Sequence, residues 1–94
     1  MRDNMPKFCI PRMLEAYGDG KMEFDIPADN IRELLVQVRE QLPDLFSNIC
    51  DEKGRLRPHI NLFINDKILV DRDGLRQRLS HIDVVSVFQS VSGG

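Results

Sequence analysis

The chain has 94 residues, which is the size of one domain with a single hydrophobic core. Thirteen Lys and Arg against fifteen Asp and Glu give a net charge of −2, so the basic excess that nucleic-acid binding needs is absent. Two cysteines exclude a disulfide scaffold, and no apolar run reaches membrane-spanning length. The opening MRDNMPK lacks the apolar core of a signal peptide. We expect one cytoplasmic domain over residues 1–94, without membrane or nucleic-acid partners.

The first elements predict a hairpin. Residues 7–10 (KFCI) are a strand that Pro11 ends, because proline has no N–H for the sheet ladder. Cys9, in this apolar run, is expected to be a buried thiol. Residues 11–20 contain two glycines and are expected to form a loop. Residues 21–26 (KMEFDI) alternate as a second strand, with one apolar face made by Met22, Phe24 and Ile26.

The clearest signal is a helix in DNIRELLVQVREQLP, residues 29–43. Its apolar residues recur at helical spacing and form one stripe: Ile31, Leu34, Leu35, Val38 and Leu42. Asn30 followed by Glu33 fits a capping box, with Asp29 as the rival cap. Pro43 ends the helix, and residues 44–49 (DLFSNI) add a short turn before a polar loop centred on Gly54.

The second half of the chain predicts three strands. Residues 59–65 carry Ile60, Leu62 and Ile64 on one face, and Asn65-Asp66 is a turn into residues 67–70. Residues 71–83 are polar and irregular, and residues 84–91 (VVSVFQSV) form the last strand. One helix must cover one face of this small mixed sheet. The order strand, strand, helix, strand, strand, strand predicts an α+β fold of the β-grasp, or ubiquitin-like, type.

The last strand predicts an exposed aromatic patch. Val85, Val87 and Val91 continue the apolar alternation, so their face is expected to be the core side. Phe88, together with Ser86, then lies on the solvent side, and Phe63 lies beside it if the two strands pair. Exposed aromatic side chains near the end of the chain indicate a docking surface. The alternative is that residues 71–83 bury one or both rings.

Four stretches together resemble the small sulfur-carrier proteins of the MoaD/ThiS family. They are FCIPRMLEAYGDGKMEFDI, NIRELLVQVREQLPDLF, DEKGRLRPHINLFINDKIL and the terminal SVSGG, and they cover most of the chain. Such carriers usually enter the last strand through Gly-Asp and have alanine before the two glycines. Here the sequence is SHIDVV, and Ser92 precedes the glycines. The resemblance therefore leaves the choice between molybdopterin, thiamine, cysteine and secondary-metabolite pathways open.

The resemblance implies a carrier and not an enzyme, and its reactive group would be the α-carboxylate of Gly94. A partner adenylyltransferase, similar to ubiquitin-activating enzymes, would activate it with ATP, which the chain itself would not bind. A sulfur donor would then form a thiocarboxylate for a sulfur-accepting biosynthetic enzyme. Gly93 and Gly94 place no Cβ beside the reacting carbonyl, and Ser92 is small enough to follow them into a narrow site. The residues expected to contact the partner are Phe63, Ser86, Phe88, Val91 and Ser92.

Three other functions compete with the carrier. A ubiquitin-like modifier, joined to a lysine of another protein, needs the same Gly-Gly end. A non-covalent β-grasp module does not need it, and its glycines would be a frayed end. RNA binding would need a basic stripe that the composition lacks. We expect no metal site, because His59 and His81 have no second ligand at suitable spacing. The acidic residues at 51–52 and 71–73, and the arginines at 55 and 57, are expected to be solvated.

Overall fold

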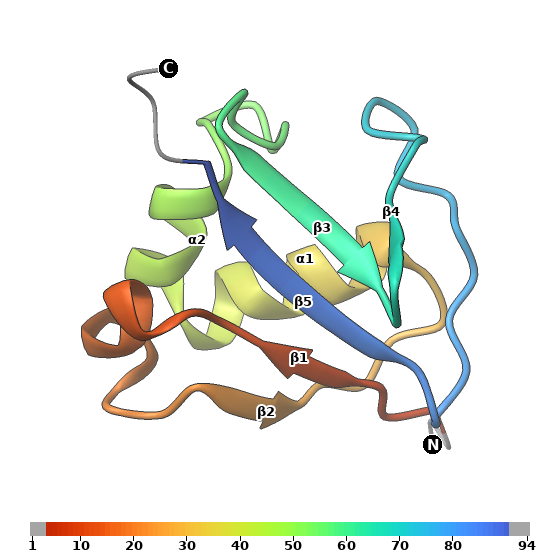
Figure 1. The fold of residues 1–94 in the computed structure, drawn as a ribbon, viewed down its shortest axis with the longest axis horizontal. Coiled ribbons are helices and arrows are strands. Elements are labelled where there is room, and N and C mark those ends of the chain that lie inside the picture. Colours follow the sequence, from red (N-terminus) through yellow and green to blue (C-terminus); the bar gives the residue numbers. More distant parts are fainter. Residues whose placement is uncertain (1–3, 91–94) are drawn as a thin grey trace.

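The computed structural model describes residues 4–90 (Figure 1). In chain order the elements are β1 (Lys7–Cys9), the 3₁₀ helix η1 (Arg12–Gly18), β2 (Glu23–Asp25), α1 (Ile31–Gln41), α2 (Pro43–Ile49), β3 (Ile60–Ile64), β4 (Lys67–Ile68) and β5 (Val84–Gln89).

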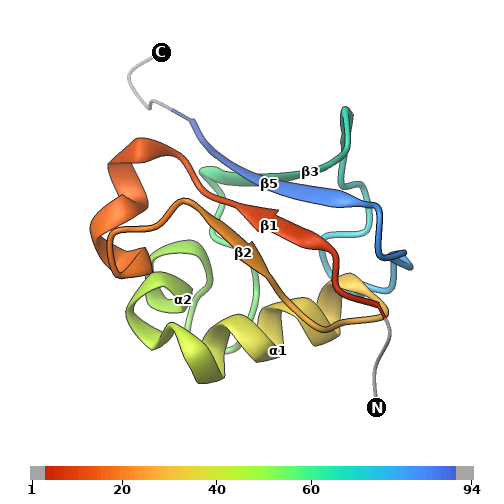
Figure 2. The same ribbon diagram turned by 90° about the horizontal axis from the view of Figure 1, so that it is seen from below.

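The strands form one mixed sheet in the order β2-β1-β5-β3-β4, so β5 is the central strand. It runs parallel to β1, where Cys9 pairs with Ser86, and antiparallel to β3, where Phe63 pairs with the same Ser86. β1–β2 and β3–β4 are antiparallel hairpins. Both α-helices lie on one side of this sheet, and its other face is open (Figure 2). This is the arrangement that the order of elements predicts.

The core lies between the helices and the sheet. The predicted stripe of α1 is buried from Ile31 to Leu42, and the inner sheet face contributes Ile60, Leu62, Ile64, Val85 and Val87 as predicted. Val91 lies outside the described residues.

Phe8 of β1 is fully buried on the helix side of the sheet. Cys9, its neighbour, points to the open face and is only half-buried, so the expectation of a buried thiol is wrong for Cys9 and holds instead for Cys50. Adjacent strand residues face opposite sides, and Phe8 takes the inner one.

Two connections contain more structure than the sequence predicts. Residues 11–20 are not simply a loop, because η1 forms there around the buried side chain of Leu14. Residues 44–49 belong to a full helix, α2, in which Pro43 occupies the first turn, where its missing N–H costs nothing. Leu45 and Ile49 anchor this helix in the core.

The segment 71–83 has no helix or strand, as predicted, yet it is part of the core. Leu75 and Leu79 are buried. Its carbonyls also complete the first turn of α1: the N–H of Ile31 donates to Gln77 and the N–H of Arg32 donates to Leu75. Free N–H groups at a helix start need such acceptors. The segment therefore fixes the start of α1.

The N-cap of α1 is Asn30, as predicted. Its Oδ1 accepts the N–H of Glu33 at 2.9 Å, while the Glu33 carboxylate accepts the N–H of Asp29 at 2.9 Å. Replacing Asn30 by alanine leaves the Glu33 N–H without this acceptor, so we expect a loss of about 1 kcal/mol in the free energy of unfolding. Urea denaturation measures it. The control is Glu40→Ala, an exposed change inside the same helix, with an expected effect below about 0.5 kcal/mol. If both variants lose the same free energy of unfolding, the Asn30 cap does not stabilise the helix.

Candidate functional site

The described chain ends at the edge of the open face. Beyond the last residue of β5, the N–H of Ser90 still donates to the carbonyl of His59 at 2.8 Å, so the strand pairing with β3 continues to that point. The backbone is therefore fixed up to Ser90. Val91, Ser92, Gly93 and Gly94, all of them predicted site residues, lie outside the described residues.

Phe63 and Phe88 lie together on the open face, as the sequence predicts. Their ring centroids are 4.8 Å apart with the rings inclined at 68°, which is the edge-to-face geometry that aromatic pairs favour. Phe88 remains 55% exposed, and Phe63 is half-buried. The segment 71–83 does not cover Phe88, so the alternative in which it buries both rings is wrong.

A third apolar side chain, which the sequence interpretation did not place on this face, belongs with the two rings. Ile68 of β4 pairs with Phe63 and is 49% exposed. We call Phe63, Ile68 and Phe88 the open-face patch. The sequence held a signal for Ile68, because the tight Asn65-Asp66 turn sets the register of β4 on β3. The patch is near the point where the described chain ends.

The other half of the open face is charged. Lys7 of β1 and Glu23 of β2 form an ion pair at 3.2 Å, and the hydrogen bond to Glu23 raises the pKa of Lys7. Asp25 pairs with Lys7 across the same hairpin. Ser86 lies at the boundary, between Cys9 on the charged side and Phe63 on the apolar side. A partner that covers the whole face must therefore match both a charged and an apolar half.

Neither cysteine is activated for thiol chemistry. Burial, together with the nearby Asp51 carboxylate, raises the pKa of Cys50 to about 12. Burial also raises the pKa of Cys9. A thiolate is the nucleophilic form, and a raised pKa reduces its population at neutral pH. The side chains of Cys9 and Cys50 are therefore poor candidates for carrying a sulfur atom.

Asp51 and Asp71, in the segments expected to be solvated, each organise a turn. Asp51 accepts the N–H groups of Lys53 and Arg55, and these hydrogen bonds lower its pKa. Asp71 accepts the N–H groups of Gly74 and Arg76, with the same effect on its pKa. Within residues 4–90, no three His, Cys, Asp or Glu side chains gather where they could hold a metal ion.

Arg55, Arg57 and His59 are also not gathered into a site. Arg55 is exposed and lies 3.4 Å from the Asp51 carboxylate, whereas Arg57 is half-buried and donates to the carbonyl of Ser47 at 3.0 Å. His59 contributes its backbone carbonyl to the end of β5, as described above. None of the helices in the described part of the chain has the length and apolar run needed to cross a bilayer.

Comparison with known proteins decides the family. A model of the ThiS family matches residues 15–94. The chain belongs to the ThiS family. This confirms the resemblance seen in the sequence, and members of the ThiS family are small ubiquitin-like carrier or modifier proteins.

A sequence relative and two solved structures show the range of ThiS-like proteins that this chain resembles. Small archaeal modifier protein 3 of Haloferax volcanii is 42% identical over 43 residues, which are 46% of this chain and 47% of that protein. The match thus spans about half of the relative's length. A chain of the BexX/CysO complex of Amycolatopsis orientalis superposes with a TM-score of 0.80 at 20% identity, over 94% of this chain and 98% of that one. Small archaeal modifier protein 1 of Methanosarcina acetivorans gives 0.79 at 25% identity, over 97% of both chains. These likenesses confirm the β-grasp fold.

Proposed function

We propose that this ThiS-family chain is a sulfur carrier that acts through the α-carboxylate of Gly94. The observation that carries the proposal is the family match, which runs through to residue 94 and includes the Gly93-Gly94 pair. The described geometry supports it, because β5 lies at the centre of the sheet and its pairing with β3 continues to Ser90, three residues before Gly93 in the sequence.

The chemistry needs two steps on the same carbonyl carbon. First, a carboxylate oxygen of Gly94 attacks the α-phosphorus of ATP in a partner adenylyltransferase, and pyrophosphate leaves. A donor sulfur at the sulfide level then attacks the acyl carbon of the adenylate and expels AMP. The product is a thiocarboxylate, whose terminal sulfur is the nucleophile delivered to a sulfur-accepting biosynthetic enzyme. The chain itself supplies the carboxylate and the surface that the partner recognises.

The length of the tail suits delivery into an enclosed site. An extended chain spans at most about 3.3–3.6 Å per residue, so the four residues after Ser90 reach on the order of 14 Å from the sheet. The globular body stays outside while the carboxylate enters. Glycine at both final positions leaves no Cβ next to the reacting atoms.

We place the docking surface of the activating enzyme on the open-face patch. Apolar and aromatic side chains dominate the centres of protein interfaces, and the patch exposes them close to the start of the tail. Ser86 lies next to Phe63 and extends the surface toward the charged half. Val91 and Ser92 follow in the sequence and would enter the partner with the glycines.

Replacing Phe88 by serine tests this docking surface. We expect about a tenfold rise in the KM for the carrier in ATP–pyrophosphate exchange, because a buried aromatic contact at an interface contributes more than about 1 kcal/mol. The free energy of unfolding should change little, since the ring is already 55% exposed. Ile82→Ser is the control, because Ile82 is 75% exposed and precedes β5 at its opposite end. If both variants have the same KM, Phe88 is not part of the docking surface.

A second candidate function has a specific observation in its favour. Two of the proteins compared above are named small archaeal modifier proteins. The same activated Gly94 carboxylate could acylate a lysine Nζ and form an isopeptide bond, with AMP as the leaving group. In this function the adenylyltransferase is unchanged, and the acceptor is an amine and not sulfur.

The mass of the intact protein tests the proposal. The protein is incubated with ATP, a sulfide donor and the adenylyltransferase encoded by its own organism, then analysed under thiol-free conditions. A carrier gains the mass difference between one sulfur and one oxygen, and fragmentation maps this gain to Gly94. An isopeptide bond through Gly94 would assign the modifier function. No reaction with ATP at Gly94 would overturn both.

A further inference from the structure

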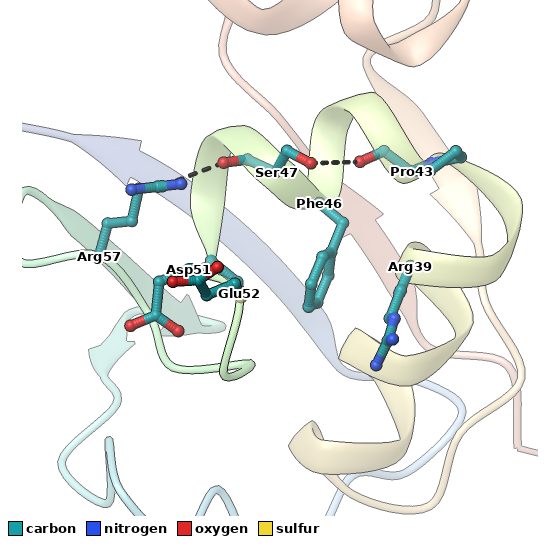
Figure 3. A pocket seen from close by; sticks show the side chains of 8 residues that line it. Arg39, Pro43, Phe46, Ser47, Asp51, Glu52 and Arg57 are labelled. Atoms are coloured by element: carbon teal, nitrogen blue, oxygen red, sulfur yellow. Dashed lines mark hydrogen bonds between the residues drawn. The ribbon is translucent and has the colours of Figure 1, made fainter.

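The helical side of the molecule carries two adjoining pockets that the proposed function does not use. One, of about 360 Å³, lies among the end of α1, α2 and the loop that follows α2 (Figure 3). The other, of about 170 Å³, lies along α1 toward Leu75. Both are lined by Arg39 and Phe46, which therefore form the divide between them. Figure 3 shows these two side chains pointing the same way from neighbouring helices.

The smaller pocket is lined by cations from two separate segments. Arg32 and Arg39 come from α1, and Lys53 comes from the loop after α2. No carboxylate lines this pocket, although the whole chain carries a net charge of −2. Three like charges around one concavity repel one another and create a local positive potential. An incoming anion relieves this repulsion.

The two arginines are held in place by neutral groups. Nη2 of Arg32 donates to the carbonyl of Gly74 at 2.7 Å, and the guanidinium of Arg39 lies 6.0 Å from the centroid of the Phe46 ring. Within residues 4–90, neither arginine forms an ion pair, and neither does Lys53. A guanidinium has five N–H donors, so Arg32 keeps most of its donors for a ligand. Among the described residues, no ion pair with a carboxylate compensates their charge.

The larger pocket has a different chemistry. Two carboxylates, Asp51 and Glu52, line it together with Arg39 and Arg57, so its lining charges are equal in number. The Arg57 guanidinium already donates to the carbonyl of Ser47 at 3.0 Å. Its charges therefore do not select an anion. The side of the Phe46 ring that lines it adds apolar surface beside the cationic pocket.

We propose that this cationic pocket binds an acidic segment of a partner protein. The carboxylates of the segment contact Arg32, Arg39 and Lys53, and an apolar side chain between them packs on the exposed Val36. The apolar walls favour a peptide over a free inorganic anion, because a peptide presents both kinds of group together. All three cations are exposed, so contacts with a single small anion would be largely screened by salt.

The position of the pocket allows two partners to bind at once. α1 and α2 cover one side of the sheet, and the open-face patch lies on the other (Figure 2). An acidic segment on the helical side leaves the patch and the tail accessible. The inference goes beyond the sulfur-carrier function and does not depend on it, since no step at Gly94 enters the argument.

A titration of the ¹⁵N-labelled full chain tests the site. The probe is an acetylated and amidated hexapeptide of alternating glutamate and leucine, and the reference peptide has glutamine at each glutamate. We expect saturable amide shifts along Arg32–Arg39 and at Lys53-Gly54 with the glutamate peptide, weakening as salt is added. The double variant Arg39→Gln/Lys53→Gln should bind about three- to tenfold more weakly.

The matched control is Arg12→Gln/Lys21→Gln, which removes two exposed cations that line neither pocket. It changes the net charge equally and should bind the peptide with unaltered affinity. An equal response to the glutamine peptide, or equal weakening in both double variants, would overturn the site. If inorganic phosphate causes the same amide shifts at the same concentrations, the ligand of the pocket is a free anion and not a peptide, and the proposal is wrong. The amide spectra of the free variants establish that each remains folded.

Discussion

Deletion of Gly93 and Gly94 is expected to abolish adenylation and thiocarboxylate formation and to leave the free energy of unfolding unchanged. The new terminal carboxylate belongs to Ser92, so it carries a Cβ beside the reacting carbon and lies about 7 Å short of its former reach. ATP–pyrophosphate exchange measures the first effect, and urea denaturation measures the second.

A length-matched variant separates the two causes. Gly93→Ala/Gly94→Ala keeps the reach of the tail but adds two Cβ atoms, so a narrow partner site should reduce its rate without the complete loss caused by deletion. Full activity of the alanine variant would mean that reach alone matters. Activity of the deletion variant would contradict the carrier and the modifier alike, and would favour a non-covalent β-grasp module.

Replacement of Arg72 by methionine is expected to cost about 3 kcal/mol in the free energy of unfolding, because three acceptors lose a charged donor together. The Arg72 guanidinium donates to the carbonyls of Ile60 at 2.7 Å and Arg57 at 2.9 Å, and to the Asn61 side chain at 3.1 Å. β4 pairs with β3 at Phe63 and Ile64, and the N–H of Leu69 donates to the carbonyl of Leu62 at 2.8 Å, so this pairing stops short of Ile60 and Asn61. Arg72 thus takes the place of a strand along the remaining edge of β3.

The control for this prediction is Arg76→Met. Arg76 also binds through its guanidinium, at 3.1 Å from the Asp71 carboxylate, but its side chain is 82% exposed. Exposed ion pairs contribute about 0–1 kcal/mol, so its loss should be small. Urea denaturation of both variants gives the comparison. A similar small loss for Arg72→Met would show that water replaces the guanidinium at the edge of β3.

The sequence predicted those elements that depend on local periodicity. The α1 stripe, the buried face of β3, and Val85 and Val87 of β5 each repeat with the period of one element, and these were placed correctly. The Phe63–Phe88 contact also followed, because one assumption about strand pairing was enough to bring the rings together.

The predictions that failed depend on contacts between distant segments. η1 forms where Leu14 is buried and where Gly18 packs closely: a Cβ on Gly18 would lie 2.8 Å from Cζ of Phe24. Leu75, Leu79 and Ile82 recur at helical spacing, yet the segment forms no helix and Ile82 is 75% exposed, so this spacing did not identify Leu75 and Leu79 as core residues. The cationic pocket could not be predicted for the same reason, since its side chains meet only after α1, the loop after α2 and residue 75 come together.

The central position of β5 has a mechanical consequence. The strand that leads to the tail is flanked by β1 on one side and β3 on the other. A force applied along the tail pulls β5 lengthwise between these neighbours, so their hydrogen bonds are loaded in shear and must break together. An edge strand peeled sideways would lose its bonds one at a time. The fold therefore resists traction at the end of β5. In the proposed carrier function, this would let a partner grip and withdraw the tail repeatedly without unravelling the domain.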